Sequence, residues 1–246
     1  QEILVVYEDH KDQAPFDLKR FSDFSQMRER VAMKLIHTKS NETLLKEIPS
    51  IPFHDLSIVF YLFLDKDEHG QMTVLIRNDH LPIWNTDTSE LYKLAIDNTP
   101  RLYPPCIRSM ASLINDMLFV NGTLIQPSFA AASPNALDLT DSPIPLSILT
   151  NTSGIFGASA MLYPGVLKEF SKKIGHDLII LPSSVHEVLL LPYDSTYSFQ
   201  EMADMVKDVN EKCVPVEEQL SNQVYYYSST QDSIFLGGDP ASRILS

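Results

Sequence analysis

Hydrophobic residues in the first half of the chain recur with two different periods. Between residues 16 and 36, apolar positions recur mostly at steps of three and four between charged residues, which predicts an amphipathic helix. Two apolar runs, residues 55–65 and 72–77, are separated by a polar break and predict a β-hairpin. Further helices are predicted over residues 41–48, 88–98 and 107–118.

The second half combines short apolar strands with two helices. Pro164 begins and Gly175 ends a predicted helix over residues 164–174, because proline fits the first turn and glycine fits the C-terminal cap. A second helix is predicted over residues 198–210. The predicted strands cover residues 146–149, 158–162, 177–181, 187–191, 223–228 and 234–236. Because the strands come as hairpins separated by single helices, we expect an α+β fold with mainly antiparallel sheets and a helical N-terminal segment.

One proline-rich segment separates the two patterned halves. Residues 126–145 contain four prolines among Ala, Ser and Asp, which predicts a loop or linker. The expected organisation is a unit over residues 1–125, this linker, a second unit over residues 146–236 and a tail over residues 237–246, with the units free to pack as one globular domain. The tripeptides His-Asp-Leu at 54–56 and 176–178 each precede a predicted strand, turn, strand and helix, which leaves an internal duplication open.

The charge balance argues against two classes of partner. The chain has 32 Asp and Glu against 19 Lys and Arg, a formal net charge of −13, so a nucleic acid would meet a repulsive surface. The longest apolar run, residues 56–64, is far shorter than the roughly 20 residues that a membrane-spanning helix needs. We therefore expect neither a nucleic-acid partner nor a membrane.

The few cysteines and the spacing of the histidines bear on compartment and cofactors. Only Cys106 and Cys213 occur, which favours a reducing compartment, and the first residues show no signal-peptide pattern. We therefore expect a soluble, cytoplasmic protein. No two histidines are four positions apart, as metal ligands on one helix face would be, so we expect no metal and no cofactor.

The most suggestive group of chemically active side chains lies between two apolar strands of the second half. Ser183, Ser184, His186 and Glu187 bring a hydroxyl, an imidazole and a carboxylate within five positions. A serine nucleophile needs a base within hydrogen-bond reach, and that base needs an orienting acid. These four are therefore the candidate catalytic residues of a hydrolase. The alternative is a polar hairpin turn whose serines bond the backbone, and alternation along a strand would point His186 and Glu187 to opposite faces.

A run of tyrosines marks the last long strand. Tyr225, Tyr226 and Tyr227 are consecutive, so their rings would alternate between the two faces of a strand. We expect at least one of them to be exposed or at an interface. Asp177, Tyr225 and Tyr227 are the candidate ligand-binding residues.

Several stretches of the second half resemble a known family. They read LSILTN at 146–151, GASA at 157–160, LYPGVLK at 162–168 and DLIILPSSVHEV at 177–188. The chain resembles here an uncharacterised bacterial family, of the anaerobic Gram-positive type, that carries a domain-of-unknown-function label. The resemblance is strongest over residues 145–228 and extends more weakly from about residue 15. It implies a bacterial, cytoplasmic protein and assigns no activity to any residue.

Two functions of different classes follow. The first is a binding or regulatory module that recognises a protein or a small ligand through a sheet face or an exposed aromatic edge. The alternative is a hydrolase that uses Ser183 or Ser184 with His186. The binding module is preferred because each candidate catalytic group has a structural explanation and this class of fold predicts no chemistry by itself.

Overall fold

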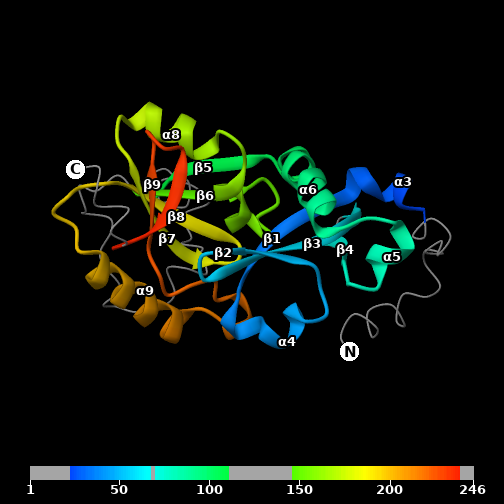
Figure 1. The fold of residues 1–246 in the computed structure, drawn as a ribbon. Coiled ribbons are helices and arrows are strands. Elements are labelled where there is room, and N and C mark those ends of the chain that lie inside the picture. The colour runs from blue at the N-terminus through cyan, green and yellow to red at the C-terminus, as the bar shows by residue number, and fades with distance from the viewer. Residues whose placement is uncertain (1–22, 68–69, 111–145, 239–246) are drawn as a thin grey trace, which may run out of the picture.

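Two antiparallel sheets and the helices around them form the protein in a computed structural model (Figure 1). The structure describes residues 23–67, 70–110 and 146–238. The prediction of an α+β fold with antiparallel sheets is confirmed. The predicted linker at 126–145 and most of the predicted tail lie outside the described residues.

The first sheet is built around one long strand, β3 (Leu56–Asp67). β1 (Val31–His37) pairs along one of its edges. β2 (Ser50–Phe53) and β4 (Gly70–Leu75) follow one another along the opposite edge. The hairpin predicted from the two apolar runs is therefore confirmed as β3 and β4.

The second sheet has six strands in the order β10-β9-β7-β8-β6-β5. These strands are β5 (Pro105–Ser109), β6 (Ser147–Asn151), β7 (Leu178–Ser184), β8 (Glu187–Pro192), β9 (Tyr225–Ser228) and β10 (Ser233–Leu236). All of the pairings are antiparallel. β5 comes from the first half of the sequence and forms an edge of this sheet, so the two halves share it.

Polar side chains cap the starts of the two longest described helices. Asp87 accepts a hydrogen bond from the Glu90 backbone at the start of α6 (Thr88–Leu102), and Ser198 accepts one from Glu201 at the start of α9 (Phe199–Cys213). Gly175, with φ +78°, ends α8 as predicted. The other helices are α3 (Phe24–Met27), α4 (Glu42–Leu45), α5 (His80–Trp84) and α8 (Val166–Ile174), with short 3-10 turns at Arg28–Arg30, Lys39–Asn41, Gly157–Leu162 and Val216–Glu218.

Helix α6 protects an open edge of the first sheet. Thr99 accepts a hydrogen bond from the backbone of Met33 at 3.1 Å, and the Asn98 carboxamide donates to the carbonyl of Val31 at 3.0 Å. Both Asn98 and Thr99 are buried. The helix therefore satisfies backbone groups of β1 that would otherwise offer an edge for strand addition.

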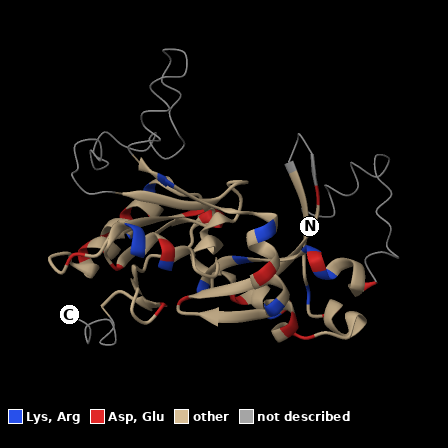
Figure 2. Ribbon diagram, turned by 90° about the horizontal axis from the view of Figure 1, so that it is seen from above, with Lys and Arg blue, Asp and Glu red and all other residues tan. Residues whose placement is uncertain are grey.

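One hydrophobic cluster joins the two sheets. It contains residues of β1, β3 and α6 together with residues of β6, β7, β8 and β9, and includes Phe60, Leu91, Leu149, Ile180 and Tyr225, all with no measurable exposure. Figure 2 shows the charged residues on the described parts of the chain, with Lys and Arg scattered between Asp and Glu instead of gathered in one stripe. Among the described residues, no helix is both long and apolar enough to cross a membrane.

Three predicted elements are wrong. Residues 31–36 were predicted as part of a helix, but they form β1, whose residues are buried almost throughout and therefore show no simple alternation. Residues 158–162 form a 3-10 turn instead of a strand, and residues 107–109 belong to strand β5 instead of a helix. The parts of the predicted helices at 16–22 and 111–118 lie outside the described residues.

Candidate functional site

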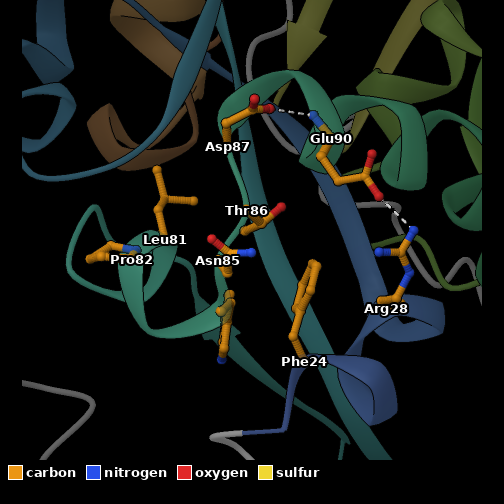
Figure 3. Close-up of a pocket in the computed structure, with 9 residues that line it drawn as sticks. Phe24, Arg28, Leu81, Pro82, Asn85, Thr86, Asp87 and Glu90 are labelled. Atoms are coloured by element: carbon orange, nitrogen blue, oxygen red, sulfur yellow. Dashed lines mark hydrogen bonds and ion pairs between the residues drawn. The ribbon is translucent and has the colours of Figure 1, made fainter.

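A pocket of about 480 Å³ opens between α3, α5 and the start of α6 (Figure 3). Leu81 and Pro82 form one side, and Phe24 and Arg28 lie opposite, with Asn85 and Thr86 between them. The full lining is Phe24, Arg28, Leu81, Pro82, Trp84, Asn85, Thr86, Asp87 and Glu90.

Short capped segments build the walls of this pocket. Asp23 caps α3 by accepting a hydrogen bond from the Ser25 backbone at 3.0 Å, which fixes where Phe24 enters the helix. Asn85 ends α5 in the left-handed conformation with φ +50°, a role that asparagine tolerates better than most residues. Asp87 then caps α6 through the Glu90 backbone at 2.8 Å. The chain therefore reverses over residues 85–87.

Two stacked aromatic rings line the pocket. The rings of Phe24 and Trp84 lie 5.2 Å apart at an interplanar angle of 15°. The Arg28 guanidinium carbon lies 5.6 Å from the centre of the Phe24 ring, within the range of a cation–π contact. Trp84 is only 5% exposed and is the single tryptophan of the chain. The ring of Phe24 therefore contacts both the ring of Trp84 and the guanidinium of Arg28.

The polar part of the lining contains a hydroxyl with no partner. Thr86 Oγ1 is buried and makes no hydrogen bond among the described residues. A buried polar atom without a partner costs free energy, so such an atom on a pocket wall indicates a place where a ligand can bond. Arg28 and Glu90 form an ion pair at the rim, and the carboxylate of Asp87 stands beside it (Figure 3).

A histidine supports the aromatic lining from behind. The His80 ring lies 5.1 Å from that of Trp84, and its Nδ1 accepts a hydrogen bond from the Arg77 backbone at 3.1 Å. Burial, and then the charge of Arg77, lower the pKa of His80. The neutral ring is therefore the form that packs against Trp84 at neutral pH.

A second depression of about 560 Å³ lies where the two sheets meet. It is lined by His37, Thr38, Lys39, Glu42, His54, Asp55, Asn222 and Gln223. Its most central carboxylate already has partners, because Asp55 accepts hydrogen bonds from Tyr225 and Ser221, both at 2.6 Å. The ring of His54 contacts the carbonyl of Ile234 at 3.0 Å. These groups hold the sheets together, so this depression is the weaker candidate.

The predicted catalytic residues lie together in the turn between β7 and β8, but they do not form a triad. Ser184 Oγ accepts a hydrogen bond from the backbone of His186 at 3.0 Å, as a polar turn requires. Ser183 is buried and lies 3.4 Å from a carboxylate oxygen of Glu187. Burial raises the pKa of Glu187, although this contact opposes the shift. Among the described residues, no hydrogen bond joins the His186 ring to either serine.

The His186 ring is used to hold the neighbouring loop. Its Nδ1 accepts a hydrogen bond from the Phe156 backbone at 3.2 Å, and the two rings stack with centres 6.0 Å apart. Its Nε2 lies 3.8 Å from a carboxylate oxygen of Glu218, and its carbonyl accepts a bond from Thr150 at 2.8 Å. Since a backbone N–H can only donate, Nδ1 is the unprotonated nitrogen and is not available to a serine.

The predicted ligand-binding residues are used inside the fold. Tyr225, Tyr226 and Tyr227 are all buried, so the expectation that one of them is exposed is wrong. Each donates to a different carboxylate: Tyr225 to Asp55, Tyr226 to Asp177, and Tyr227 to Asp232. Burial and the neighbouring carboxylate raise the pKa of each tyrosine.

The carboxylate of Asp177 belongs to this arrangement. It accepts two hydrogen bonds from Ser229, one from the backbone at 2.9 Å and one from the hydroxyl, in addition to the bond from Tyr226. Burial alone would raise the pKa of Asp177, but these hydrogen bonds outweigh it and hold the pKa below its usual value. The residue therefore anchors β9 to the start of β7.

Metal-binding groups are absent from the described part of the chain, where no three His, Cys, Asp or Glu side chains are placed to hold an ion. Cys106 and Cys213 are both half-buried. The residues of the first pocket carry no motif, so sequence reasoning missed them. The one available signal was the single tryptophan beside Pro82 in a short segment between two predicted elements.

Comparison with known proteins yields one match. A family model described as a family of unknown function (DUF5688) matches residues 1–229. No curated protein and no solved structure matches the chain. The match confirms that the resemblance is to a family of unknown function.

Proposed function

Because the chain belongs to the family of unknown function DUF5688, its role has to be argued from its own residues, and we propose that it is a non-enzymatic binding module. Its ligand, a short segment of a protein or a small molecule, occupies the pocket between α3, α5 and α6. The observation that carries this proposal is the unpartnered, buried hydroxyl of Thr86 on the wall of a pocket with an aromatic lining.

The composition of the pocket suits binding better than catalysis. An aromatic surface and a few convergent polar groups are typical of ligand sites. Glu90 is paired with Arg28, and Asp87 is occupied by its helix cap, so neither is placed beside a nucleophile. The hydrolase alternative receives no support, because among the described residues neither serine bonds the His186 ring, and the unprotonated nitrogen of that ring already accepts the Phe156 N–H.

The proposal includes a location in the bacterial cytoplasm. Its support is the sparse use of cysteine, with only two in 246 residues, together with the family resemblance of the second half.

Trp84 provides a direct test, since its fluorescence reports on this pocket alone. A panel of short peptides and a set of small aromatic and aliphatic compounds are titrated while Trp84 emission is recorded. We expect at least one probe to shift the emission in a saturable way. A flat response to every probe would refute the binding site.

Two variants connect such a response to the pocket. Thr86→Val removes the unpartnered hydroxyl, so the free protein should be at least as stable, while binding should weaken about fivefold, as expected for one hydrogen bond of about 1 kcal/mol. Leu81→Ala removes an apolar side chain from the lining of the pocket, whereas Val216→Ala removes an exposed apolar side chain elsewhere. Only Leu81→Ala should weaken binding.

A further inference from the structure

The corner of the molecule around the pocket carries an excess of carboxylates. The two segments that contribute the lining, residues 23–30 and 79–90, contain the acids Asp23, Glu29, Asp79, Asp87 and Glu90 and the bases Arg28 and Arg30. This local excess has the same sign as the net charge of −13. A cationic ligand is therefore attracted both from a distance and at contact.

Both arginines of this corner are already used. Arg28 is paired with Glu90. The Arg30 guanidinium donates to the backbone carbonyl of Leu64. Glu29 and Asp79 form no ion pair among the described residues, and Asp87 accepts only the backbone bond of its cap. Of the three charged residues in the lining, Arg28 and Glu90 neutralise each other, so the charge left at the pocket is the negative charge of Asp87.

The lining also offers apolar contacts and a hydrogen bond, which a simple cation cannot use. Phe24, Trp84 and Leu81 offer apolar contact, and the exposed ring of Pro82 adds to it. Thr86 Oγ1 can accept or donate one hydrogen bond. A peptide segment provides backbone N–H and C=O groups for that bond and side chains for the apolar contact.

From this combination, we propose that the pocket binds a basic peptide segment of a partner protein. An aliphatic side chain of the segment packs against Phe24 and Trp84, a backbone group bonds Thr86, and a flanking Lys or Arg side chain faces Asp87. This inference rests on the proposed function and specifies its ligand.

Three model peptides isolate the contribution of charge. The blocked pentapeptides Lys-Leu-Lys-Leu-Lys, Ser-Leu-Ser-Leu-Ser and Glu-Leu-Glu-Leu-Glu share the same two leucine anchors and carry positive, neutral and negative side chains at the other three positions. Each is titrated into the full chain while Trp84 emission is recorded. We expect the lysine peptide to bind tightest and to weaken as ionic strength rises from about 0.01 M to about 0.1 M, which shortens the Debye length from about 30 Å to about 10 Å.

A matched pair of variants localises the effect. Asp87→Asn removes one charge at the pocket and keeps the helix cap, because asparagine caps as well as aspartate does. Asp194→Asn removes the same charge from the loop between β8 and α9, where Asp194 accepts a similar backbone bond from Thr196. We expect Asp87→Asn to weaken the lysine peptide about threefold, as for an exposed pair. Asp194→Asn should leave its affinity unchanged.

The outcomes separate the two proposals. If the serine or glutamate peptide binds as tightly as the lysine peptide, or if Asp194→Asn weakens binding as much as Asp87→Asn, the basic-peptide inference is overturned while the pocket remains a binding site. If no peptide and none of the small compounds perturbs Trp84, the binding function itself fails.

Discussion

The three consecutive tyrosines of β9 offer a matched series for testing how burial sets the value of a hydrogen bond. Tyr225→Phe, Tyr226→Phe and Tyr227→Phe each remove one hydroxyl from neighbouring positions of the same strand. Each hydroxyl donates to a different carboxylate. The deleted atom is the same in all three, so differences in stability report on the surroundings.

The structure gives the expected order. Tyr225 is completely buried, and its bond of 2.6 Å to Asp55 joins the second sheet to the turn before β3 in the first. A hydrogen bond to a charged group contributes about 1.5–3 kcal/mol, so we expect Tyr225→Phe to cost about 2 kcal/mol. Tyr226→Phe should cost about 1 kcal/mol, because Asp177 keeps both of its bonds from Ser229.

Tyr227→Phe should cost least of the three. Its ring is buried, but its hydroxyl reaches Asp232, whose side chain is 49% exposed and also pairs with Lys168 at 3.0 Å. Water can replace the lost partner there, and the ion pair remains.

Urea denaturation of the four proteins measures the series. The urea concentration at the midpoint should be highest for the wild type and decrease through Tyr227→Phe and Tyr226→Phe to Tyr225→Phe, while the dependence of the unfolding free energy on urea stays the same. For a chain of this size, a loss of about 2 kcal/mol corresponds to a fall in Tm of about 4–8 °C. A cost for Tyr227→Phe equal to or above that for Tyr225→Phe would refute the reasoning from burial. It would also indicate that the Asp55 bond does not couple the sheets.

Three further predictions concern the His186 turn. His186→Ala should destabilise the protein by about 1 kcal/mol more than His186→Asn in urea, because the asparagine carboxamide can still accept the Phe156 N–H. Glu187→Gln should raise Tm at neutral pH and leave it unchanged below about pH 4: a carboxyl whose pKa is raised on folding contributes stability at low pH that is lost as pH rises. Gly157→Ala should lower the free energy of unfolding by about 2–3 kcal/mol in urea, because the new Cβ would lie 2.4 Å from the carbonyl oxygen of His186. Gly154→Ala has open space around its Cβ and should cost only the backbone strain of φ +69°.

The strands that were predicted correctly are those whose apolar runs are separated by polar turns, and the strand that was missed is buried on both faces. β3 with β4, and β7 with β8, were predicted because apolar runs are separated by turns of polar residues. β1 was mistaken for a helix because both of its faces are covered, so its apolar residues do not alternate. In such a strand the spacing of apolar residues can match a helix by chance, and only the pairing with β3 decides.

The candidate sites show a different limit. The sequence correctly predicted that four polar residues lie together in one turn: Ser183, Ser184, His186 and Glu187. Their spacing did not predict which partners they bond, and the structure shows bonds to the backbone and to one another. The pocket residues come from segments about 60 positions apart, and Arg28 meets Glu90 only through tertiary packing. Proximity of this kind is set by the fold and leaves no local pattern in the sequence.

The two His-Asp-Leu tripeptides illustrate how one chemical requirement can produce a repeated sequence. Asp55 directly precedes β3 and Asp177 directly precedes β7, the first strand of a hairpin in each case. Each aspartate accepts hydrogen bonds from one tyrosine of β9 and from one serine close to β9 in the sequence. A carboxylate with several acceptor positions is the group that can satisfy two hydroxyls at once where a buried strand begins. Both aspartates therefore have the same structural reason to occupy their positions, and the echo needs no duplication to explain it. The same hydrogen bonds make Asp177 and the tyrosines unavailable to a ligand, whereas the lining of the Trp84 pocket contains an unpartnered hydroxyl together with two aromatic rings.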